Sequence, residues 1–155
     1  ISSAASDVYK RQDLISTLKD LGVQPILIGD GDVSGGLKAA EGSVDLLYGI
    51  GAAPEGVITA TAVKAMGGFF EGRLHFMDES FKERALKMLG SDINNLWSAD
   101  DLCRSSDSFF IASGVCSGWI PGVKFDGNKA EVTSKIIFGD SSETQIITNE
   151  YILGE

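Results

Sequence analysis

The stretch from residue 44 to residue 68, VDLLYGIGAAPEGVITATAVKAMGG, constrains the fold more than any other part of this chain. Residues 44–48 predict a buried strand, a glycine-rich turn follows at residues 49–53, and Pro54 begins a predicted helix that extends to about Met66. Proline suits the first turn of a helix because its missing N–H would have no partner there. Strand, glycine turn and helix N-terminus together bind anions such as phosphate in α/β proteins, since free N–H groups and the helix dipole point out of the turn.

Glu55, in the first turn of this predicted helix, has two interpretations. A carboxylate there stabilises the helix through the dipole alone. Alternatively, Glu55 holds a divalent cation that in turn holds a phosphate, because a carboxylate cannot meet a phosphate directly. A dinucleotide-binding loop fits poorly: Gly49 and Gly51 match G-x-G-x-x-G, but Pro54 stands where the third glycine should be.

Composition narrows the class of protein. A chain of 155 residues is long enough for one domain with a sizeable core. A net charge of −9 argues against a nucleic-acid-binding surface. Cys103 and Cys116 lack metal-site spacing, so free thiols in a reducing cytoplasm are expected. No apolar run reaches about 18 residues, which predicts no membrane span.

The first twelve residues, ISSAASDVYKRQ, differ from the rest because they are small and polar, then basic, without a clear period. We expect residues 1–12 to be a linker or adaptor segment rather than native domain sequence. The domain itself is then residues 13–155, and the missing initial methionine suggests a truncated chain.

Periodicity predicts helices and strands that alternate up to about residue 115, followed by antiparallel strands with hairpin turns. The expected helices are residues 13–21, 33–40, 54–66, 79–89 and 98–104, the last with a Ser98–Asp101 capping box. The expected strands are residues 25–29, 44–48, 69–76, 107–115, 123–125, 130–138 and 143–152. This order predicts an α/β fold of the α+β kind, a mixed sheet with helices on both faces.

Acidic residues follow the first two predicted strands. Asp30 and Asp32 flank Gly31, which allows a tight turn. Because ligands of open α/β sheets bind at the carboxyl edge of the strands, Asp30, Asp32 and Glu55 are expected to converge there. Ionised carboxylates only accept hydrogen bonds, so they suit sugar hydroxyls or a hard divalent cation. Alternatively, Asp32 caps the following helix and Asp30 merely ends a strand.

Other reactive residues have weaker patterns. His75 is the single histidine, and no G-x-S-x-G elbow accompanies it, so we expect a structural role within a strand. Residues 113–115 are small, and either let a ligand approach the backbone or form an ordinary turn. Lys124 and Lys129 are expected to be solvated hairpin charges.

Several spaced motifs together resemble a known family. They are IGDGDV at residues 28–33, GIGAAPEGV at 49–57, MGG at 66–68, DDL at 100–102, ASGV at 112–115 and the segment 118–127. These motifs resemble class II fructose-1,6-bisphosphatases of the bacterial GlpX type, over about residues 13–152.

The resemblance implies a fold like that of the lithium-sensitive, metal-dependent sugar phosphatases, of which this chain would be the C-terminal half. It implies hydrolysis of the C1 phosphate of fructose 1,6-bisphosphate in gluconeogenesis, aided by Mg²⁺ or Mn²⁺. Some members also cleave sedoheptulose 1,7-bisphosphate. The implied partner is therefore a small-molecule sugar bisphosphate, bound by an enzyme that is a homo-oligomer at full length, without nucleic acid or membrane.

The resemblance also implies roles for individual residues. Asp30, Gly31 and Asp32 match the family's DGD substrate loop, and Glu55 matches its metal-binding glutamate. Ala52 stands where many members have a substrate-contacting glycine. No catalytic residue is carried over, because the remaining metal carboxylates and the water-positioning threonine would lie in a first half that this sequence lacks.

The isolated chain is accordingly expected to be inactive or nearly so. Two alternatives stay open: a phosphatase for another sugar bisphosphate, such as the sedoheptulose compound, and a non-catalytic sugar-phosphate-binding module that needs no metal. A third alternative is a fragment without activity, which would aggregate because its broken sheet is exposed.

Overall fold

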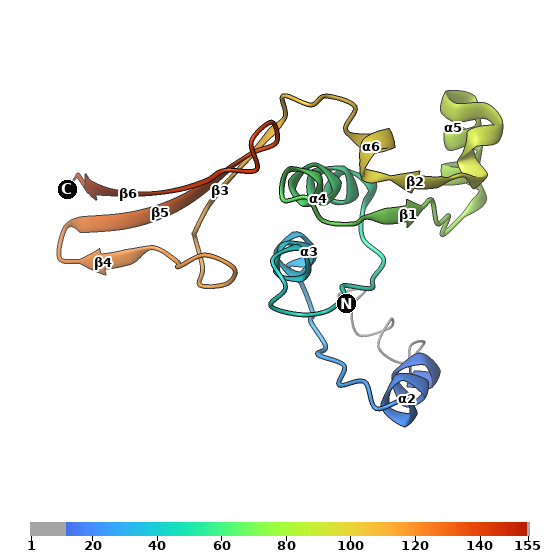
Figure 1. Cartoon of the computed structure of the whole chain (residues 1–155), viewed down its shortest axis with the longest axis horizontal. Coiled ribbons are helices and arrows are strands. Elements are labelled where there is room, and N and C mark those ends of the chain that lie inside the picture. The colour runs from blue at the N-terminus through green and yellow to red at the C-terminus, as the bar shows by residue number, and fades with distance from the viewer. Residues whose placement is uncertain (1–11, 155) are drawn as a thin grey trace. The chain divides into compact units, whose positions relative to one another are not determined.

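A computed structural model describes residues 12–154 of the chain (Figure 1). The chain divides into two compact units, Ile1–Gly31 and Asp32–Glu155. The predicted linker or adaptor segment lies outside the described residues except for Gln12, so its nature stays a prediction.

The first unit contains helix α2 (Gln12–Asp20), as the sequence predicts. Gly22 follows the helix with a φ of +79°, a conformation that glycine adopts without strain. The strand predicted at residues 25–29 is wrong, because this segment forms no strand and Ile26 and Leu27 are 74% and 61% exposed. An apolar run becomes a buried strand only between neighbouring strands, and the described part of the chain supplies none here.

In the second unit, helices α3 (Asp32–Ala40) and α4 (Ala53–Ala65) pack against each other. Their contact is close because a Cβ atom at Gly36 would lie only 2.5 Å from Thr59 Cγ2. Both helices begin and end near the predicted residues. α4 has Ala52 as its N-cap and Pro54 in its first turn, as the proline signal indicates.

The segment between these helices is the second incorrect prediction. Residues 44–48 form no strand, and Leu46 and Tyr48 are 75% and 70% exposed. Val44 and Leu47 are half-buried, and Leu47 Cδ2 lies near Gly36 of α3. The exposed and half-buried residues do not alternate as in a strand, and among residues 12–154 no strand lies beside this segment to make a sheet.

A small sheet and three short helical elements follow. Their bounds are β1 (Glu71–Arg73), α5 (Glu79–Leu89), the 3₁₀ helix η1 (Gly90–Asn94), β2 (Leu96–Ser98) and α6 (Ala99–Leu102). β1 pairs antiparallel with β2 and is shorter than predicted, so exposed His75 follows the strand instead of lying in it. α5 has the predicted bounds, and the predicted capping box joins Ser98 and Asp101 at the start of α6.

The last third of the chain forms a four-stranded antiparallel sheet. Its strands are β3 (Phe109–Ser113), β4 (Lys124–Asp126), β5 (Lys129–Phe138) and β6 (Thr144–Ile152). β6 pairs along β5, while β3 and β4 pair with opposite halves of β5. The hairpin predicted at residues 126–128 is confirmed, with Gly127 at a φ of +59°.

The mixture of helices and sheet agrees with the predicted α/β class, but the single mixed sheet with helices on both faces is wrong for the described residues. The strands there form two separate antiparallel sheets, because the two segments expected to pair in parallel are irregular. Helix α4 contacts both α6 and strand β3.

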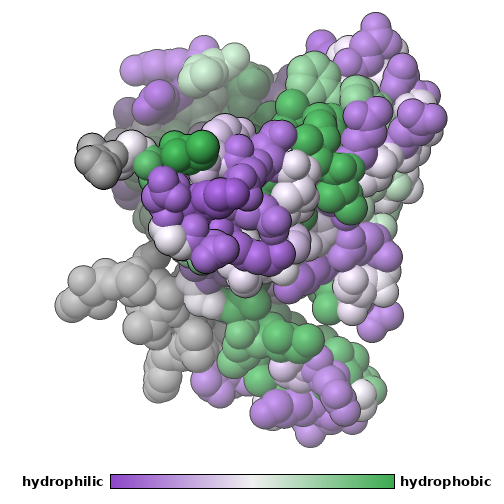
Figure 2. All heavy atoms as spheres, turned by 90° about the vertical axis from the view of Figure 1, so that its left-hand side faces the viewer, coloured by the Kyte–Doolittle hydropathy of each residue, from purple (hydrophilic) through white to green (hydrophobic). Residues whose placement is uncertain are grey.

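Apolar side chains divide unevenly between interior and surface. The largest fully buried side chains are Leu37 of α3 and Ile137 of β5. Many other large apolar residues are exposed, and Figure 2 shows such green side chains among purple hydrophilic ones. None of the helices described has the length and apolar character needed to cross a membrane.

Candidate functional site

The N-terminus of α4 is the part of the predicted site that the structure describes most fully. Gly56 N–H donates the first intrahelical bond, 3.1 Å from the carbonyl oxygen of Ala52. The N–H groups of Ala53 and Glu55 precede that bond, and no side chain caps the helix at Ala52. Two backbone donors and the positive end of the helix dipole are therefore available to an anion.

Glu55 is exposed in this first turn. Within residues 12–154, no hydrogen bond or ion pair involves its carboxylate, while its carbonyl oxygen accepts from Thr59 Oγ1 at 2.7 Å. The bond from Thr59 holds the backbone of Glu55 in place but does not involve the Glu55 carboxylate. The geometry suits both interpretations of Glu55, a charge that stabilises the helix and a ligand for a cation.

Asp32 lies against the glycine turn that precedes α4. A Cβ atom at Gly51 would lie 3.0 Å from Asp32 Oδ2, so a side chain at position 51 would press on this carboxylate. Asp32 is the first residue of α3, and its carboxylate accepts no hydrogen bond from residues 12–154. The structure thus brings Asp32 beside the turn that carries Ala52 and Glu55, and gives it no capping bond.

Asp30 and Gly31 belong to the first unit. Gly31 has a φ of +85°, and its N–H donates to Asp30 Oδ1 at 2.7 Å. Glycine is needed here because other residues rarely adopt this φ. The predicted tight turn is therefore present, and the hydrogen bond from Gly31 N–H orients the Asp30 carboxylate within it.

Ala52 is the position at which the sequence resemblance implies a substrate-contacting glycine in other chains. Its φ of −73° and ψ of 151° are open to any residue, so the backbone does not require glycine at this position. Its methyl group is exposed and narrows the approach to the turn without straining it. The role of Ala52 in substrate binding stays a prediction.

A complete cation site is not found in the described part of the chain. There, no three His, Cys, Asp or Glu side chains lie close enough together to hold a metal ion. Glu55 could supply one oxygen ligand, but divalent cations need several. The residues described therefore do not fit a whole metal centre.

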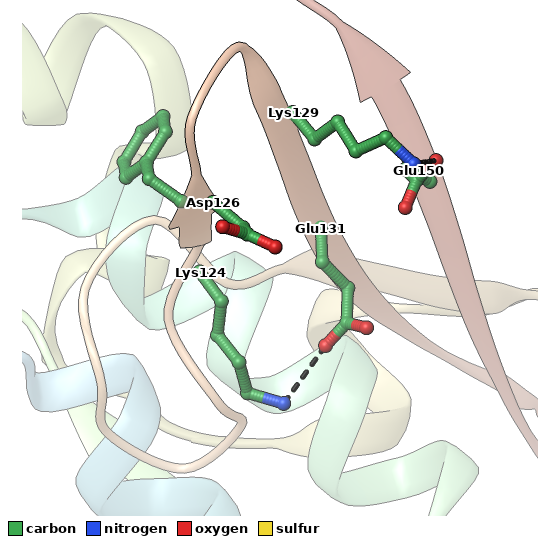
Figure 3. Close-up of a pocket in the computed structure, with 6 residues that line it drawn as sticks. Lys124, Asp126, Lys129, Glu131 and Glu150 are labelled. Carbon is green, nitrogen blue, oxygen red and sulfur yellow. Dashed lines mark hydrogen bonds and ion pairs between the residues drawn. The ribbon is translucent and has the colours of Figure 1, made fainter.

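A hollow of about 330 Å³ lies on the β4–β5 hairpin and contains none of the predicted site residues (Figure 3). Lys124 pairs with Glu131 and Lys129 pairs with Glu150, each at 2.8 Å. These ion pairs link neighbouring strands, as expected for hairpin charges at a sheet surface. We assign the hollow no part in the site.

Sequence reasoning singled out residues 113–115 and 118–127 but did not predict where the loop between β3 and β4, residues 114–123, lies in the fold. A Cβ atom at Gly118 would lie 3.8 Å from Ser34 Oγ, so this loop reaches the first turn of α3, two residues from Asp32. The regular spacing of Gly114, Gly118 and Gly122 is a further signal, which indicates a tightly folded loop but not its neighbour.

Comparison with known proteins decides the family. The family described as "Bacterial fructose-1,6-bisphosphatase, glpX-encoded" matches residues 6–151. This chain belongs to that family. The matched range includes all five predicted site residues of this fructose-1,6-bisphosphatase family member.

Curated relatives agree with the assignment. The chain is 33% identical, over 164 residues, to the D-fructose 1,6-bisphosphatase class 2/sedoheptulose 1,7-bisphosphatase of Trichodesmium erythraeum (strain IMS101), covering 96% of this chain and 48% of the relative. It is 35% identical, over 158 residues, to the second such protein of Acaryochloris marina (strain MBIC 11017), covering 90% of this chain and 45% of the relative. The chain spans about half the length of these relatives.

Proposed function

We propose that this chain forms the sugar-binding part of the active site of a class II fructose-1,6-bisphosphatase and supplies one of its cation ligands. The reaction is hydrolysis of the C1 phosphate of fructose 1,6-bisphosphate to fructose 6-phosphate in gluconeogenesis. The observation that carries the proposal is the contact of the Asp32 carboxylate with Gly51, which joins one acidic motif to the turn that bears the other.

The residues of the proposed site have different roles in binding, which follow from their chemistry. The carboxylate of Asp32 accepts hydrogen bonds from sugar hydroxyls, and Asp30 with Gly31 contributes to the same substrate loop. The free N–H groups at the start of α4 donate to phosphate oxygens, close to the exposed Ala52. Negative carboxylates beside a negative phosphate repel it, so binding of a bisphosphate calls for a cation as well.

Mg²⁺ or Mn²⁺, when bound, supplies Lewis-acid chemistry that activates water and shields the phosphoryl charge. Glu55 offers one oxygen to such an ion. Because the described residues lack a full ligand set, the chain by itself should hold the ion weakly.

The fold of the complete enzyme is proposed to be that of the lithium-sensitive sugar phosphatases. We also propose that the complete enzyme is homo-oligomeric and cytoplasmic. Cys103 and Cys116 are free thiols, as the cytoplasmic assignment requires.

The test is a chimera in which residues 13–155 follow the first half of the Trichodesmium erythraeum relative. Phosphate release from fructose 1,6-bisphosphate with Mn²⁺ is measured for the chimera and for Glu55→Gln. The matched control is Glu79→Gln, which makes the same chemical change in the first turn of α5. We expect a loss of about a hundredfold or more in the Glu55 variant, since one lost charge contact in an active site costs several kcal/mol, and none in the control.

Equal activity in both variants would reduce Glu55 to a charge that stabilises its helix. No activity of the chimera on fructose 1,6-bisphosphate or sedoheptulose 1,7-bisphosphate would refute the phosphatase assignment. The second substrate is included because the relatives' names include it.

A second candidate is a non-catalytic sugar-phosphate-binding module. The lack of a cluster of metal ligands in the described part of the chain favours it. In that case, the 155-residue chain binds fructose 1,6-bisphosphate equally well with Mn²⁺ and with a chelator, and Glu55→Gln leaves the affinity unchanged. Calorimetric titration separates the two candidates.

A further inference from the structure

The β3–β4 loop, residues 114–123, has a compact shape that depends on glycine. Its ends are joined by a hydrogen bond of 3.2 Å from Val123 N–H to the carbonyl oxygen of Val115. A Cβ atom at Gly114 would overlap the carbonyl oxygen of Pro121. The loop is therefore folded closely upon itself, and these contacts give its tip a fixed shape.

A group of three side chains, which we call the latch, fastens this loop: Glu41, Trp119 and Lys135. Trp119 Nε1 donates to Glu41 Oε2 at 2.8 Å, and Lys135 Nζ lies 3.4 Å from the same oxygen. Lys135 Nζ also lies 4.1 Å from the centre of the Trp119 ring. Ser43 Oγ donates to the other carboxylate oxygen at 2.9 Å, and Phe110 meets the Trp119 ring edge to face.

The latch joins segments that are far apart in the sequence: the end of α3, the loop and strand β5. Hydrogen bonds to a carboxylate are stronger than neutral ones, and the ammonium group gains both a salt bridge and a cation–π contact. Partial burial raises the pKa of Glu41, but its hydrogen-bond donors and the Lys135 charge together lower it below its ordinary value. The carboxylate is therefore charged at neutral pH, as the latch requires.

A second contact places the loop tip. Gly118 approaches Ser34 in the first turn of α3, whereas Trp119 reaches Glu41 just after the helix ends. Ser34 and Glu41 are seven residues apart, which is two helical turns, or about 10 Å along one face. The loop thus lies along α3. Its tip is beside Ser34, which follows Asp32 by two residues in the sequence.

We infer that the tip of the β3–β4 loop, residues 116–120, is a wall of the sugar-phosphate site beside Asp32, and that the Glu41–Trp119–Lys135 latch positions it. This inference rests on the proposed function. Ser117 and Gly118 are exposed at the tip. Gly118 N–H donates within the loop to the carbonyl oxygen of Ile120, whereas the Ser117 hydroxyl accepts from Gly122 N–H and can still donate its own proton to an oxygen of a sugar bisphosphate. Trp119 and Glu41 act through the loop and are positioning residues.

The first experiment is hydrogen exchange of the chimera described above, with and without fructose 1,6-bisphosphate and Mn²⁺. We expect the ligand to slow exchange in residues 49–55 and also in residues 116–120. Slower exchange in residues 49–55 alone would overturn the wall and leave the proposed function standing. Unchanged exchange in both segments would overturn both.

The second experiment tests the latch with Trp119→Phe, which replaces the indole by a smaller aromatic ring without the N–H, and with Glu41→Gln, which removes the charge. The matched control is Glu131→Gln, which makes the same chemical change as Glu41→Gln and breaks the ion pair with Lys124. In both latch variants we expect the Kd for fructose 1,6-bisphosphate to rise about tenfold, because a charged hydrogen bond contributes more than 1 kcal/mol. Protection of residues 116–120 by the ligand should be lost as well.

The control should retain wild-type affinity and protection. Latch variants with unchanged affinity and unchanged ligand protection would show that Trp119 and Glu41 do not position the loop. A similar loss in the control would show that the effect comes from general weakening of the sheet, and would equally refute the latch.

Discussion

Replacement of Gly36 by alanine tests the contact that sets Asp32 beside the α4 turn. The new Cβ would lie 2.5 Å from Thr59 Cγ2, about 0.9 Å closer than the shortest ordinary contact of 3.4 Å. Thr59 cannot rotate away freely, because its Oγ1 donates to the carbonyl oxygen of Glu55 at 2.7 Å. Either that bond breaks, at about 1 kcal/mol, or the two helices separate.

The expected magnitude follows from two opposing effects. Alanine gains about 1 kcal/mol over glycine inside a helix, whereas overpacking of a close contact costs about 1–3 kcal/mol. Gly36→Ala should therefore lower the free energy of unfolding by about 0–2 kcal/mol. Gly56→Ala is the matched control, since it lies in α4 with no other atom within 4 Å of its Cβ, and it should stabilise the chain by about 1 kcal/mol.

Urea unfolding of the 155-residue chain measures the difference between these variants. A gap of about 2 kcal/mol corresponds to a midpoint difference of about 1 M urea at an unchanged slope. If Gly36→Ala raised the midpoint as much as Gly56→Ala, α3 and α4 would not pack as described. The placement of Asp32 against Gly51 would then be refuted as well.

Three further predictions concern acid titration, metal dependence and exposed apolar residues. Trp119→Phe should raise the pKa of Glu41 toward its ordinary value of 4.5, as NMR titration of the carboxyl group can show. Because folding lowers this pKa, the stability that Glu41 contributes is present above pH 4.5 and is lost as the pH falls through the lowered value. A midpoint of unfolding that rose as the pH fell would contradict this assignment. The isolated chain should release no phosphate from fructose 1,6-bisphosphate above background with Mn²⁺, and measurable turnover would show that it holds a complete site. Replacement of exposed Leu46 and Tyr48 by serine should change the free energy of unfolding by less than about 0.5 kcal/mol for each residue, and a larger loss on urea unfolding would show that the segment is buried.

Local signals predicted most of the elements correctly. The bounds of α5, the Ser98–Asp101 capping box and the hairpin at Gly127 depend on residues a few positions apart, so the sequence itself contains the interacting groups. The start of α4 was predictable for the same reason, since Pro54 acts within its own turn.

The two incorrect strands show where such reasoning fails. Residues 25–29 and 44–48 have the apolar patterns of strands, but a strand also needs a partner, and no local pattern specifies one. In the structure, Ile26, Leu46 and Tyr48 are largely exposed instead. The predicted mixed sheet was wrong because its parallel part depended on these segments.

The candidate site divides in the same way. The sequence determined which residues are chemically suited to it: Asp30 and Asp32 around Gly31, and Glu55 after the glycine turn. Only the tertiary structure decided that Asp32 touches Gly51 and that Trp119 reaches Glu41 across 78 positions of sequence. Contacts of this kind depend on how separate helices, loops and strands pack together, so they follow from the folded arrangement and not from neighbours along the chain.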